Sequence, residues 1–393
     1  MDEQKNQDFE NEALGATEAK SKKTVSPKLI IGAAIIVVIV SALLVFFLGA
    51  NARKYKKAFE LIESGDYAAA YELFCELGDY KDAKNEVKKF RYVPVKAVEK
   101  EELDGVVEEY STTTISYNEQ NLPKQIITTD ADGDKAICDY TYDKNGNCIK
   151  SVETYSDGDQ YVWDYTYDEK GNCIRKVYTN SEGNKTISDY TYDENGNCIK
   201  GVYTYSDGEK YIGDYTYDVN GNRIKEVSTN SDGDKTIRDY TYDANGNCIK
   251  EVYTNSEGNK TIHDYTYDAN GNCVKEVWTY SDGDKIIYDY TYDANGNCVK
   301  EVYTNSDGEK SIGDYTYDAK GNCIKAVWTD SDGEKEIYEY TYDKNGNCIK
   351  EVWIDESGEK EIIEMEYQFV YIPFEMTEED EEKFEEFLMV WIY

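Results

Sequence analysis

The sequence predicts a mainly β fold, in which tandem antiparallel β-hairpins form a curled sheet or superhelix, preceded by a transmembrane helix and a small α-helical hairpin. Three observations lead to this prediction. A 25-residue unit recurs ten times between residues 114 and 363, each unit contains two turn signals, and the runs between the turns are rich in Tyr, Thr, Val and Ile. A fixed period of this size is typical of a repeat architecture, and these residues fit a pleated strand. Each unit is therefore interpreted as one β-hairpin.

The unit is clearest in the copy that opens at Asp264, with the sequence DYTYDANGNCVKEVWTYSDGDKIIY. A degraded copy opens at Thr114. The remaining copies open at Asp139, Asp164, Asp189, Asp214, Asp239, Asp289, Asp314 and Glu339.

Two turn signals divide each unit. Asn270-Gly271 favours a two-residue type I′ turn, because both central positions of that turn need positive φ and Asn and Gly tolerate it best. Lys170-Gly171 and Lys320-Gly321 replace this pair in two copies, with a first residue that suits positive φ less well. The second signal, Ser281-Asp282-Gly283, fits a longer loop with glycine in the left-handed region.

The hairpin register predicts which side chains share a face. Folding about the first turn places Tyr267 opposite Val274 and Tyr265 opposite Glu276, with Trp278 on the same aromatic face. The second turn places Trp278 opposite Tyr288, and a three-residue loop would shift this register by two without changing either face. The other face is expected to carry Cys273, Val277, Ile262, Thr266, Lys275, Asp264 and Asp268.

The sheet as a whole is expected to curl. Roughly twenty strands exceed the number that a twisted sheet sustains while remaining flat. We therefore expect the strands to coil into a superhelix or to close on themselves, and the sequence leaves both outcomes open.

The repeated pattern Tyr-x-Tyr-Asp-x-x-Gly-Asn, followed by an apolar strand and a later Asp-Gly, resembles the YD repeats of bacterial RHS and teneurin-like proteins. The resemblance covers residues 139–363 and is specific in Tyr242-Asp243 and Gly246-Asn247. It implies a curled sheet of β-hairpins, which in large family members closes into a shell around a toxin. The array in this chain is short, and its unit is unusually uniform.

The charge balance limits the choice of partner. The chain has 80 acidic and 43 basic residues, which gives a net charge of −37. Nucleic acid is excluded as a partner, because binding to phosphates needs clustered Lys and Arg. Residues 1–28 are polar, without hydrophobic periodicity, and are predicted to form a disordered tail.

Residues 29–50 form an apolar run of 22 residues, with Lys28 before it and Arg53 after it. At about 1.5 Å per residue such a helix crosses the hydrocarbon core of a bilayer. The alternative is a cleaved signal peptide with Ala50-Asn51-Ala52 at the cleavage site, but the apolar stretch is long for that. We predict a single-pass protein of the bacterial cell membrane. Basic residues are almost equal on the two sides of the span, and we favour a cytoplasmic tail with the repeat region extracellular.

The segments around the array complete the domain organisation. Residues 51–92 resemble part of a tetratricopeptide-like helical hairpin, with its turn at Gly65-Asp66 and a further helix ending near Arg91. Residues 93–113 are interpreted as a linker. Residues 364–393 are interpreted as a closing strand followed by a capping helix that begins after Thr377.

Eight of the ten cysteines occupy one repeat position, and Arg223 replaces the ninth copy. Equivalent positions in successive hairpins lie two strands apart, about 9 to 10 Å. Disulfides need Cα atoms within about 7 Å, so we expect free thiols. The same spacing disfavours a zinc site, and turn chemistry explains the calcium-like pattern of Asp268, Asn270 and Asn272. No metal site and no cofactor are predicted.

The sequence predicts a protein that is not an enzyme. His263 is the only histidine, and tandem identity works against the convergence of different residues that catalysis needs. The candidate binding site is an aromatic ladder at one repeat position, which stacks on sugars or partner side chains unless it forms the core. The ladder consists of Tyr178, Tyr203, Tyr253, Trp278, Tyr303, Trp328 and Trp353.

We therefore expect a membrane-anchored surface repeat protein with a binding or structural role towards cell-wall glycan, host glycan or a surface protein. Two alternatives stay open. One is a membrane scaffold that faces the cytoplasm, which free thiols would suit. The other is the remnant of an RHS-type polymorphic-toxin shell.

Overall fold

The computed structural model describes residues 50–373 and divides into two compact units, the first ending at Ala83 and the second beginning at Lys84. The predicted tail, the predicted span up to residue 49 and the predicted C-terminal helix lie outside the described residues. Among residues 50–373, every helix is too short or too polar to cross a membrane.

The first unit contains a helical hairpin. Residues 50–63 are helical, Gly65 turns the chain with φ 80°, and α2 (Tyr67–Leu77) follows. The side chain of Asp66 caps α2 by accepting a hydrogen bond from the backbone N–H of Ala69 at 3.3 Å. Phe74 is fully buried between the two helices. A small helical region thus follows residue 50, as expected, and its likeness to a tetratricopeptide repeat stays a prediction.

The connection between the units differs from the sequence prediction. The further helix expected to end near Arg91 is α3 (Ala83–Val87), of only five residues. It is short because β1 already begins at Phe90.

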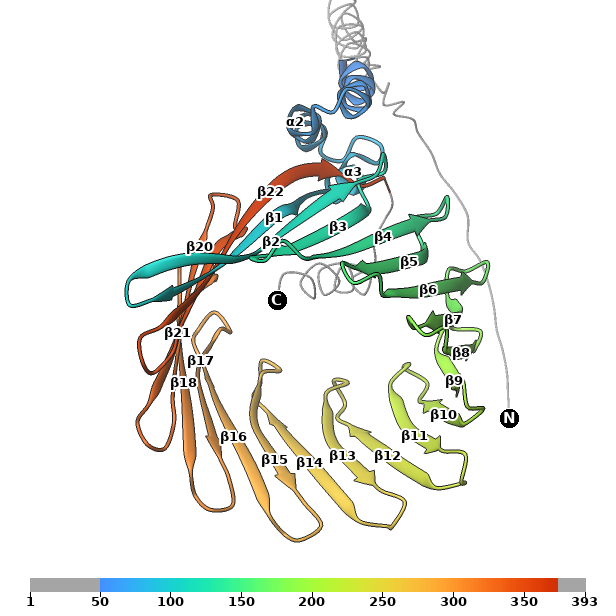
Figure 1. Cartoon of the computed structure of the whole chain (residues 1–393), viewed down its shortest axis with the longest axis vertical. Helices are drawn as coiled ribbons and strands as arrows, with labels where there is room; N and C mark the ends of the chain where they lie inside the picture. The colour runs from blue at the N-terminus through green and yellow to red at the C-terminus, as the bar shows by residue number, and fades with distance from the viewer. Residues whose placement is uncertain (1–49, 374–393) are drawn as a thin grey trace, which may run out of the picture. The chain divides into compact units, whose positions relative to one another are not determined.

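The second unit is one antiparallel sheet of 22 strands, whose hairpins follow one another around a ring (Figure 1). The first four strands are β1 (Phe90–Leu103), β2 (Val106–Tyr117), β3 (Pro123–Asp130) and β4 (Lys135–Tyr142). The next nine are β5 (Cys148–Tyr155), β6 (Gln160–Tyr167), β7 (Cys173–Thr179), β8 (Lys185–Tyr192), β9 (Cys198–Thr204), β10 (Lys210–Tyr217), β11 (Arg223–Thr229), β12 (Lys235–Tyr242) and β13 (Cys248–Thr254). The last nine are β14 (Lys260–Tyr267), β15 (Cys273–Thr279), β16 (Lys285–Tyr292), β17 (Cys298–Thr304), β18 (Lys310–Tyr317), β19 (Cys323–Thr329), β20 (Lys335–Tyr342), β21 (Cys348–Ile354) and β22 (Lys360–Tyr371).

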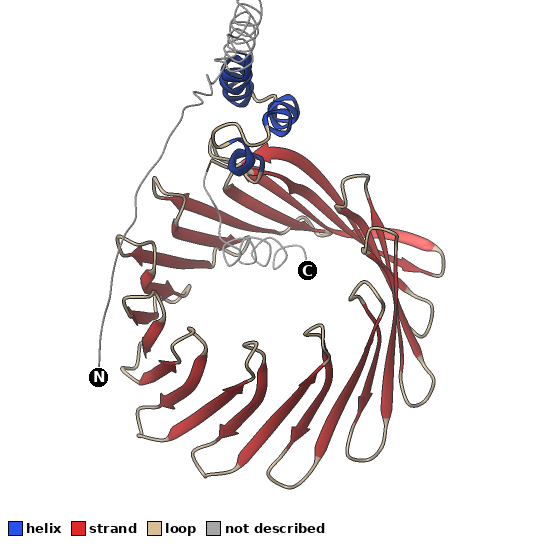
Figure 2. Ribbon diagram, turned by 180° about the vertical axis from the view of Figure 1, so that it is seen from behind, coloured by secondary structure: helices blue, strands red, loops and turns tan. Residues whose placement is uncertain are grey.

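The sheet is closed, because β1 pairs with β22 on one side and with β2 on the other (Figure 2). Ala97 lies opposite Met365 in one ladder and opposite Thr113 in the other. Closure satisfies both edges of the array, which an open superhelix would leave exposed. The structure thus selects closure from the two outcomes that the sequence left open.

The interpretation of residues 93–113 as a linker is wrong. This stretch forms most of β1 and β2, the strands that close the ring. Val93, Ala97 and Val98 are buried. Charged residues between and after them obscure the apolar pattern in the sequence. Their ion pairs stabilise the seam, which is the pairing of β1 with β22: Lys100 contacts Glu364 across it.

The first turn of each unit is not a type I′ turn. Gly271 has φ 90°, whereas Asn270 is not among the residues with positive φ. The Gly271 N–H donates to the Asp268 carbonyl at 3.2 Å, and the Asp268 N–H donates to the Asn272 carbonyl at 2.9 Å. These bonds define a three-residue loop with a type I turn and a glycine bulge.

The side chain of Asp268 explains why this turn forms. One carboxylate oxygen accepts hydrogen bonds from the N–H groups of Asn270 and Asn272, at 2.8 and 2.9 Å. This cap stabilises a type I turn, in which only the glycine needs positive φ. Lys170 and Lys320 therefore fit the position before the turn glycine as well as asparagine does, because this position does not need positive φ.

The second turn is a three-residue loop of the same kind, with Gly283 at φ 97° as predicted. The Tyr280 N–H donates to the Asp284 carbonyl at 2.9 Å. As a result, the pairing of the two strands joined by this turn is shifted by two residues from the predicted pairing of Trp278 with Tyr288. Trp278 lies opposite Ile286, and Tyr288 lies opposite Glu276.

A bulge after the first turn changes the face on which the cysteines lie. Tyr267 pairs with Cys273, and the neighbouring Thr266 pairs with Lys275, so residue 274 has no ladder partner. The cysteine therefore shares the face of the tyrosines, and the prediction that it lies on the opposite face is wrong. In the copy that opens at Asp139, Cys148 packs against the cluster that contains Tyr140.

The two faces of the sheet have different chemistry. The aromatic face carries the side chains equivalent to Tyr265, Tyr267 and Trp278, and small residues such as Ser228 and Ala326 are buried among these rings. The opposite face, here called the ion-pair face, carries a lysine or arginine against an acid in nearly every repeat. Examples are Lys150–Asp164, Arg175–Asp189, Lys250–Asp264, Lys275–Asp289 and Lys325–Glu339.

Candidate binding face

The seven residues of the predicted ladder lie on the aromatic face, and each side chain is partly exposed. They come from alternate strands, from Tyr178 in β7 to Trp353 in β21. Six of the ladder rings contact a ring on an adjacent strand. The ring of Tyr253 instead lies against the guanidinium of Arg238. The structure thus brings the predicted residues together with aromatic neighbours, among them Tyr288, which the sequence register had already placed near Trp278.

The ring contacts are densest between β14 and β17. Trp278 stacks on His263 with a centroid distance of 4.5 Å and an interplanar angle of 14°. Tyr288 contacts Trp278 at 5.6 Å on one side and Tyr303 at 5.4 Å on the other. These four rings form a run across four strands, which a long ligand could follow.

The second tyrosine of each Tyr-Thr-Tyr has a structural role. Tyr267 donates its hydroxyl hydrogen to the carbonyl of Cys248, 19 residues earlier, at 2.9 Å. Seven other repeats repeat this bond at 2.7 to 2.9 Å, from Tyr167, Tyr192, Tyr217, Tyr242, Tyr292, Tyr317 and Tyr342. These hydroxyls connect successive hairpins and are not free donors for a ligand.

The aromatic face also carries a row of carboxylates that the sequence prediction did not include. Glu276 accepts hydrogen bonds from Trp278 Nε1 and from Tyr290 Oη, both at 3.3 Å. Glu301 accepts one from Tyr315 Oη at 3.2 Å. Burial raises the pKa of Glu301 above its ordinary value, and the neighbouring Glu276 charge adds to the rise. The expected pairing of Tyr265 with Glu276 already pointed to this row.

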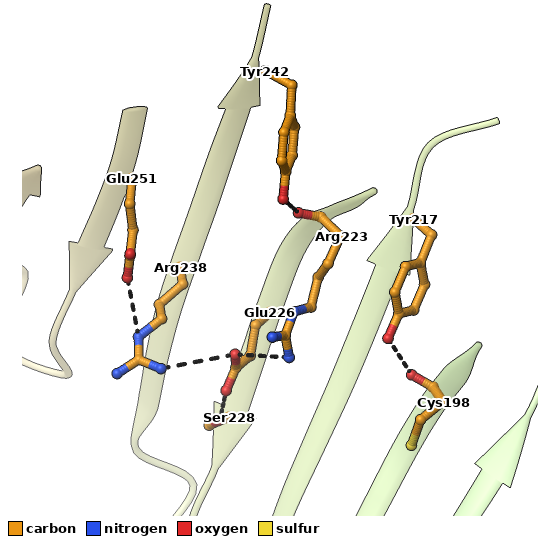
Figure 3. A network of polar contacts seen from close by, with 8 residues as sticks. All are labelled: Cys198, Tyr217, Arg223, Glu226, Ser228, Arg238, Tyr242 and Glu251. Carbon is orange, nitrogen blue, oxygen red and sulfur yellow. Dashed lines mark hydrogen bonds and ion pairs between the residues drawn. The ribbon is translucent and has the colours of Figure 1, made fainter. Parts of the chain in front are cut away.

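One pair of carboxylates holds a cation of the chain itself (Figure 3). Arg238 lies between Glu226 and Glu251, with nitrogen to oxygen distances of 3.9 and 3.5 Å. Its guanidinium also lies over the ring of Tyr253 at 5.4 Å from the centroid. Carboxylates and aromatic rings together stabilise a cation on this face.

Arg223, at the position held by cysteine elsewhere, lies beside this network. Its guanidinium is 5.5 Å from the Tyr215 ring, 5.8 Å from the Tyr240 ring and 3.6 Å from Glu226. A groove of 590 Å³ runs between the neighbouring hairpin turns, with Asp218 on one side and Asp243 on the other.

The titratable side chains of residues 50–373 are spread along the repeats. In residues 50–373, no three His, Cys, Asp or Glu side chains converge as a metal site would require. All ten cysteines are free thiols, and burial raises the pKa of Cys148 to about 11. A thiol with so high a pKa stays protonated at neutral pH and is a poor nucleophile.

Comparison with known proteins identifies the repeat. A family model for the RHS Repeat matches residues 267–310. No curated protein sequence matches the chain. Similar solved structures include TcdB2-TccC3 without its hypervariable C-terminal region, with a TM-score of 0.36 and 16% identity over 65% of this chain, and TcdB2-TccC3-Cdc42, with 0.35 and 13% over 76%. This chain spans 16% and 20% of their lengths. A porin-like protein from Bacteroides uniformis has a TM-score of 0.29 and 11% identity, covering 70% of this chain and 96% of its own.

Proposed function

We propose that this chain is a non-catalytic scaffold of the RHS repeat kind, which holds an extended polypeptide against its aromatic face. The observation that carries the proposal is the closed sheet, in which β1 joins β22 to β2 and leaves no edge strand for pairing in the ring. Binding by strand addition is thereby disfavoured, and the faces become the surfaces for recognition. The match of residues 267–310 to the RHS Repeat model supports the same class.

Membrane anchoring belongs to this proposal as an expectation from residues 29–50. A chain with one span there, its tail in the cytoplasm and its repeats outside, would display the ring at the cell surface. Protease treatment of intact cells tests the orientation: loss of the repeat region places it outside, whereas survival beside digested surface proteins places it inside.

A second candidate is glycan binding. It is favoured by the three partly exposed tryptophans Trp278, Trp328 and Trp353, because indole rings stack on sugars. The two candidates predict different ligands for the same face.

Intrinsic fluorescence separates the candidates, since Trp163, Trp278, Trp328 and Trp353 all lie on the aromatic face. The full-length protein in detergent micelles is titrated with 12-residue peptides of neutral, acidic and basic composition, and with a hexamer of N-acetylglucosamine. A saturable change in emission with any peptide, absent with the hexamer, supports the polypeptide scaffold. A change with the hexamer alone would favour the glycan candidate and overturn the scaffold, and no change with either would overturn both.

A further inference from the structure

The aromatic face is divided by charge along the ring. Between β7 and β12 it carries Lys176, Arg223 and Arg238, each close to a tyrosine ring. From β15 through β22 to β1, strands that are described throughout, the register puts no lysine or arginine on this face. Its ionisable acids there are Glu276, Glu301, Glu336, Glu351, Glu361, Glu99 and Glu101.

The lysines of the same strands lie on the ion-pair face, because side chains alternate along a strand. Lys275 pairs with Asp289 at 2.6 Å, and Lys325 pairs with Glu339 at 2.7 Å. These cations are therefore held on the far side of the sheet from Glu276 and Glu301. Within residues 50–373, the hydrogen bonds to these two carboxylates come from Trp278, Tyr290 and Tyr315.

The repeat supplies an internal comparison for this arrangement. Glu226 and Glu251 flank Arg238, which lies opposite Glu226 in the ladder. Glu276 and Glu301 stand at the equivalent positions two repeats later, and the residue equivalent to Arg238 is Tyr288. The second pair of carboxylates thus keeps the aromatic setting of the first pair and lacks its cation.

We propose that the aromatic face from β15 to β22 binds an extended, Lys/Arg-rich polypeptide segment, whose ammonium or guanidinium groups lie over Tyr288 and pair with Glu276 and Glu301, as Arg238 pairs with Glu226 and Glu251. This inference rests on the proposed use of the aromatic face as a binding surface and names the chemistry of its partner. The ligand cation lies against the rings of Trp278, Tyr288 and Tyr303 and neutralises the two half-buried carboxylates.

The spacing of the carboxylates specifies the spacing of the charges. Equivalent residues in successive hairpins are two strands apart, about 10 Å across the sheet. A polypeptide in the extended polyproline II conformation advances about 3.1 Å per residue with three residues per turn, so a basic residue at every third position lies on one side and matches this spacing. The peptide (Arg-Gly-Ser)4 is therefore the appropriate probe, and a peptide of the same composition with its four arginines in one block is the control.

The test measures binding of fluorescent (Arg-Gly-Ser)4 to the full-length protein in micelles at physiological salt. Glu276→Gln/Glu301→Gln keeps acceptors for the tryptophan and tyrosine donors but removes both charges, and should weaken binding about tenfold or more. The matched control, Asp282→Asn/Asp307→Asn, removes two charges from exposed turns in the same repeats and should change binding less than twofold. Equal losses in both variants would mean that the net negative charge alone attracts the peptide, and would overturn the proposal.

A gain-of-charge variant supplies an independent readout. Tyr288→Arg places a cation between Glu276 and Glu301, as Arg238 is placed in the earlier repeats, and should abolish the preference for (Arg-Gly-Ser)4 over the block peptide. An unchanged preference would contradict the proposal. Neutral peptides that bind as tightly as (Arg-Gly-Ser)4 would overturn this inference and leave the scaffold function standing, whereas failure of every peptide would remove both.

Discussion

The hydroxyl of Tyr267 donates a hydrogen bond of 2.9 Å to the backbone carbonyl of Cys248 in the preceding repeat. The adjacent residue, Asp268, caps the turn of its own hairpin. Tyrosine and aspartate at these two neighbouring positions thus have separate tasks: one connects the hairpins and the other shapes them. The Tyr-Asp pair of the repeat is explained by structure and needs no ligand.

Removing one such connection should lower stability. Tyr267→Phe deletes the donor to Cys248 and keeps the ring, so the free energy of unfolding should fall by about 1 kcal/mol. Urea denaturation followed by tryptophan emission measures the change. Tyr303→Phe is the control, since no hydrogen bond from its hydroxyl forms in the described part of the chain, and it should change the free energy by less than about 0.5 kcal/mol.

Substitutions in the first turn distinguish the observed loop from the type I′ turn expected from sequence. Gly271→Ala forces a β-carbon into positive φ and should cost about 1 kcal/mol or more. Asn270→Lys should be nearly neutral, because Lys170 and Lys320 stand at the same position in other repeats. A large loss for Asn270→Lys in urea denaturation would indicate that position 270 does need positive φ.

The turn aspartates make stability depend on pH. The side-chain hydrogen bond from Asn247 holds the pKa of Asp243 below its ordinary value of 3.8, and Asp343 falls to about 2 because hydrogen bonds led by that of Asn347 outweigh burial. A folded-state pKa below the unfolded one gives stability that is complete above pH 3.8 and is lost as pH falls towards 2. The urea midpoint should therefore drop between pH 5 and pH 2. Asp343→Asn should show a smaller drop than the wild type, and an equal drop would contradict this assignment.

The buried thiols should resist alkylation. Burial raises the pKa of Cys148 to about 11 and that of Cys138 to about 12. Their thiolate fractions at pH 8 are therefore about a hundredfold and about a thousandfold below that of an ordinary cysteine. Iodoacetamide labelling followed by mass spectrometry should modify the exposed Cys75 first. Labelling in urea is the control and should make the ten rates converge. Rapid labelling of Cys148 in the folded protein would show that the thiols are accessible and ionised.

The sequence was sufficient to predict the hairpins and the two-faced strands, because the period, the turn glycines and the alternation are local signals. The register at the second turn was missed by two residues because residues 281–283 form a three-residue loop. At the first turn the pairing of Tyr265 with Glu276 was predicted correctly. Only the turn type was missed there, because Asn270-Gly271 resembles a type I′ signal, whereas the Asp268 carboxylate stabilises a type I turn. The bulge at residue 274 then moved the cysteines to the aromatic face. The sequence register already placed Glu276 opposite Tyr265 on the aromatic face. The observed register then showed that Tyr288, and not a residue like Arg238, lies opposite Glu276.

The choice between closure and an open superhelix was beyond prediction because it depends on pairing between residues far apart in the chain. Lys100 and Glu364 are 264 residues apart, and they meet across the seam. In the sequence, the charged residues of β1 and β2 resemble a linker. The pairing of β1 with β22 shows that they belong to the sheet. The aromatic ladder was predicted by position, although its use in binding stays a proposal.

Hydrogen exchange tests the closure itself. In the closed sheet, β1 has partners on both sides, so its backbone amides should be protected as well as those of a mid-array strand such as β15. An open superhelix would leave one edge of β1 and one edge of β22 unpaired, and alternate amides along these two edges would exchange with water quickly. The measurement compares peptides from residues 90–103, 106–117 and 360–371 with one from residues 273–279 by mass spectrometry. Comparable protection in all four supports the ring. Fast exchange confined to β1 and β22 would show that the seam opens in solution, and a seam that opens would give the scaffold an entrance for its ligand.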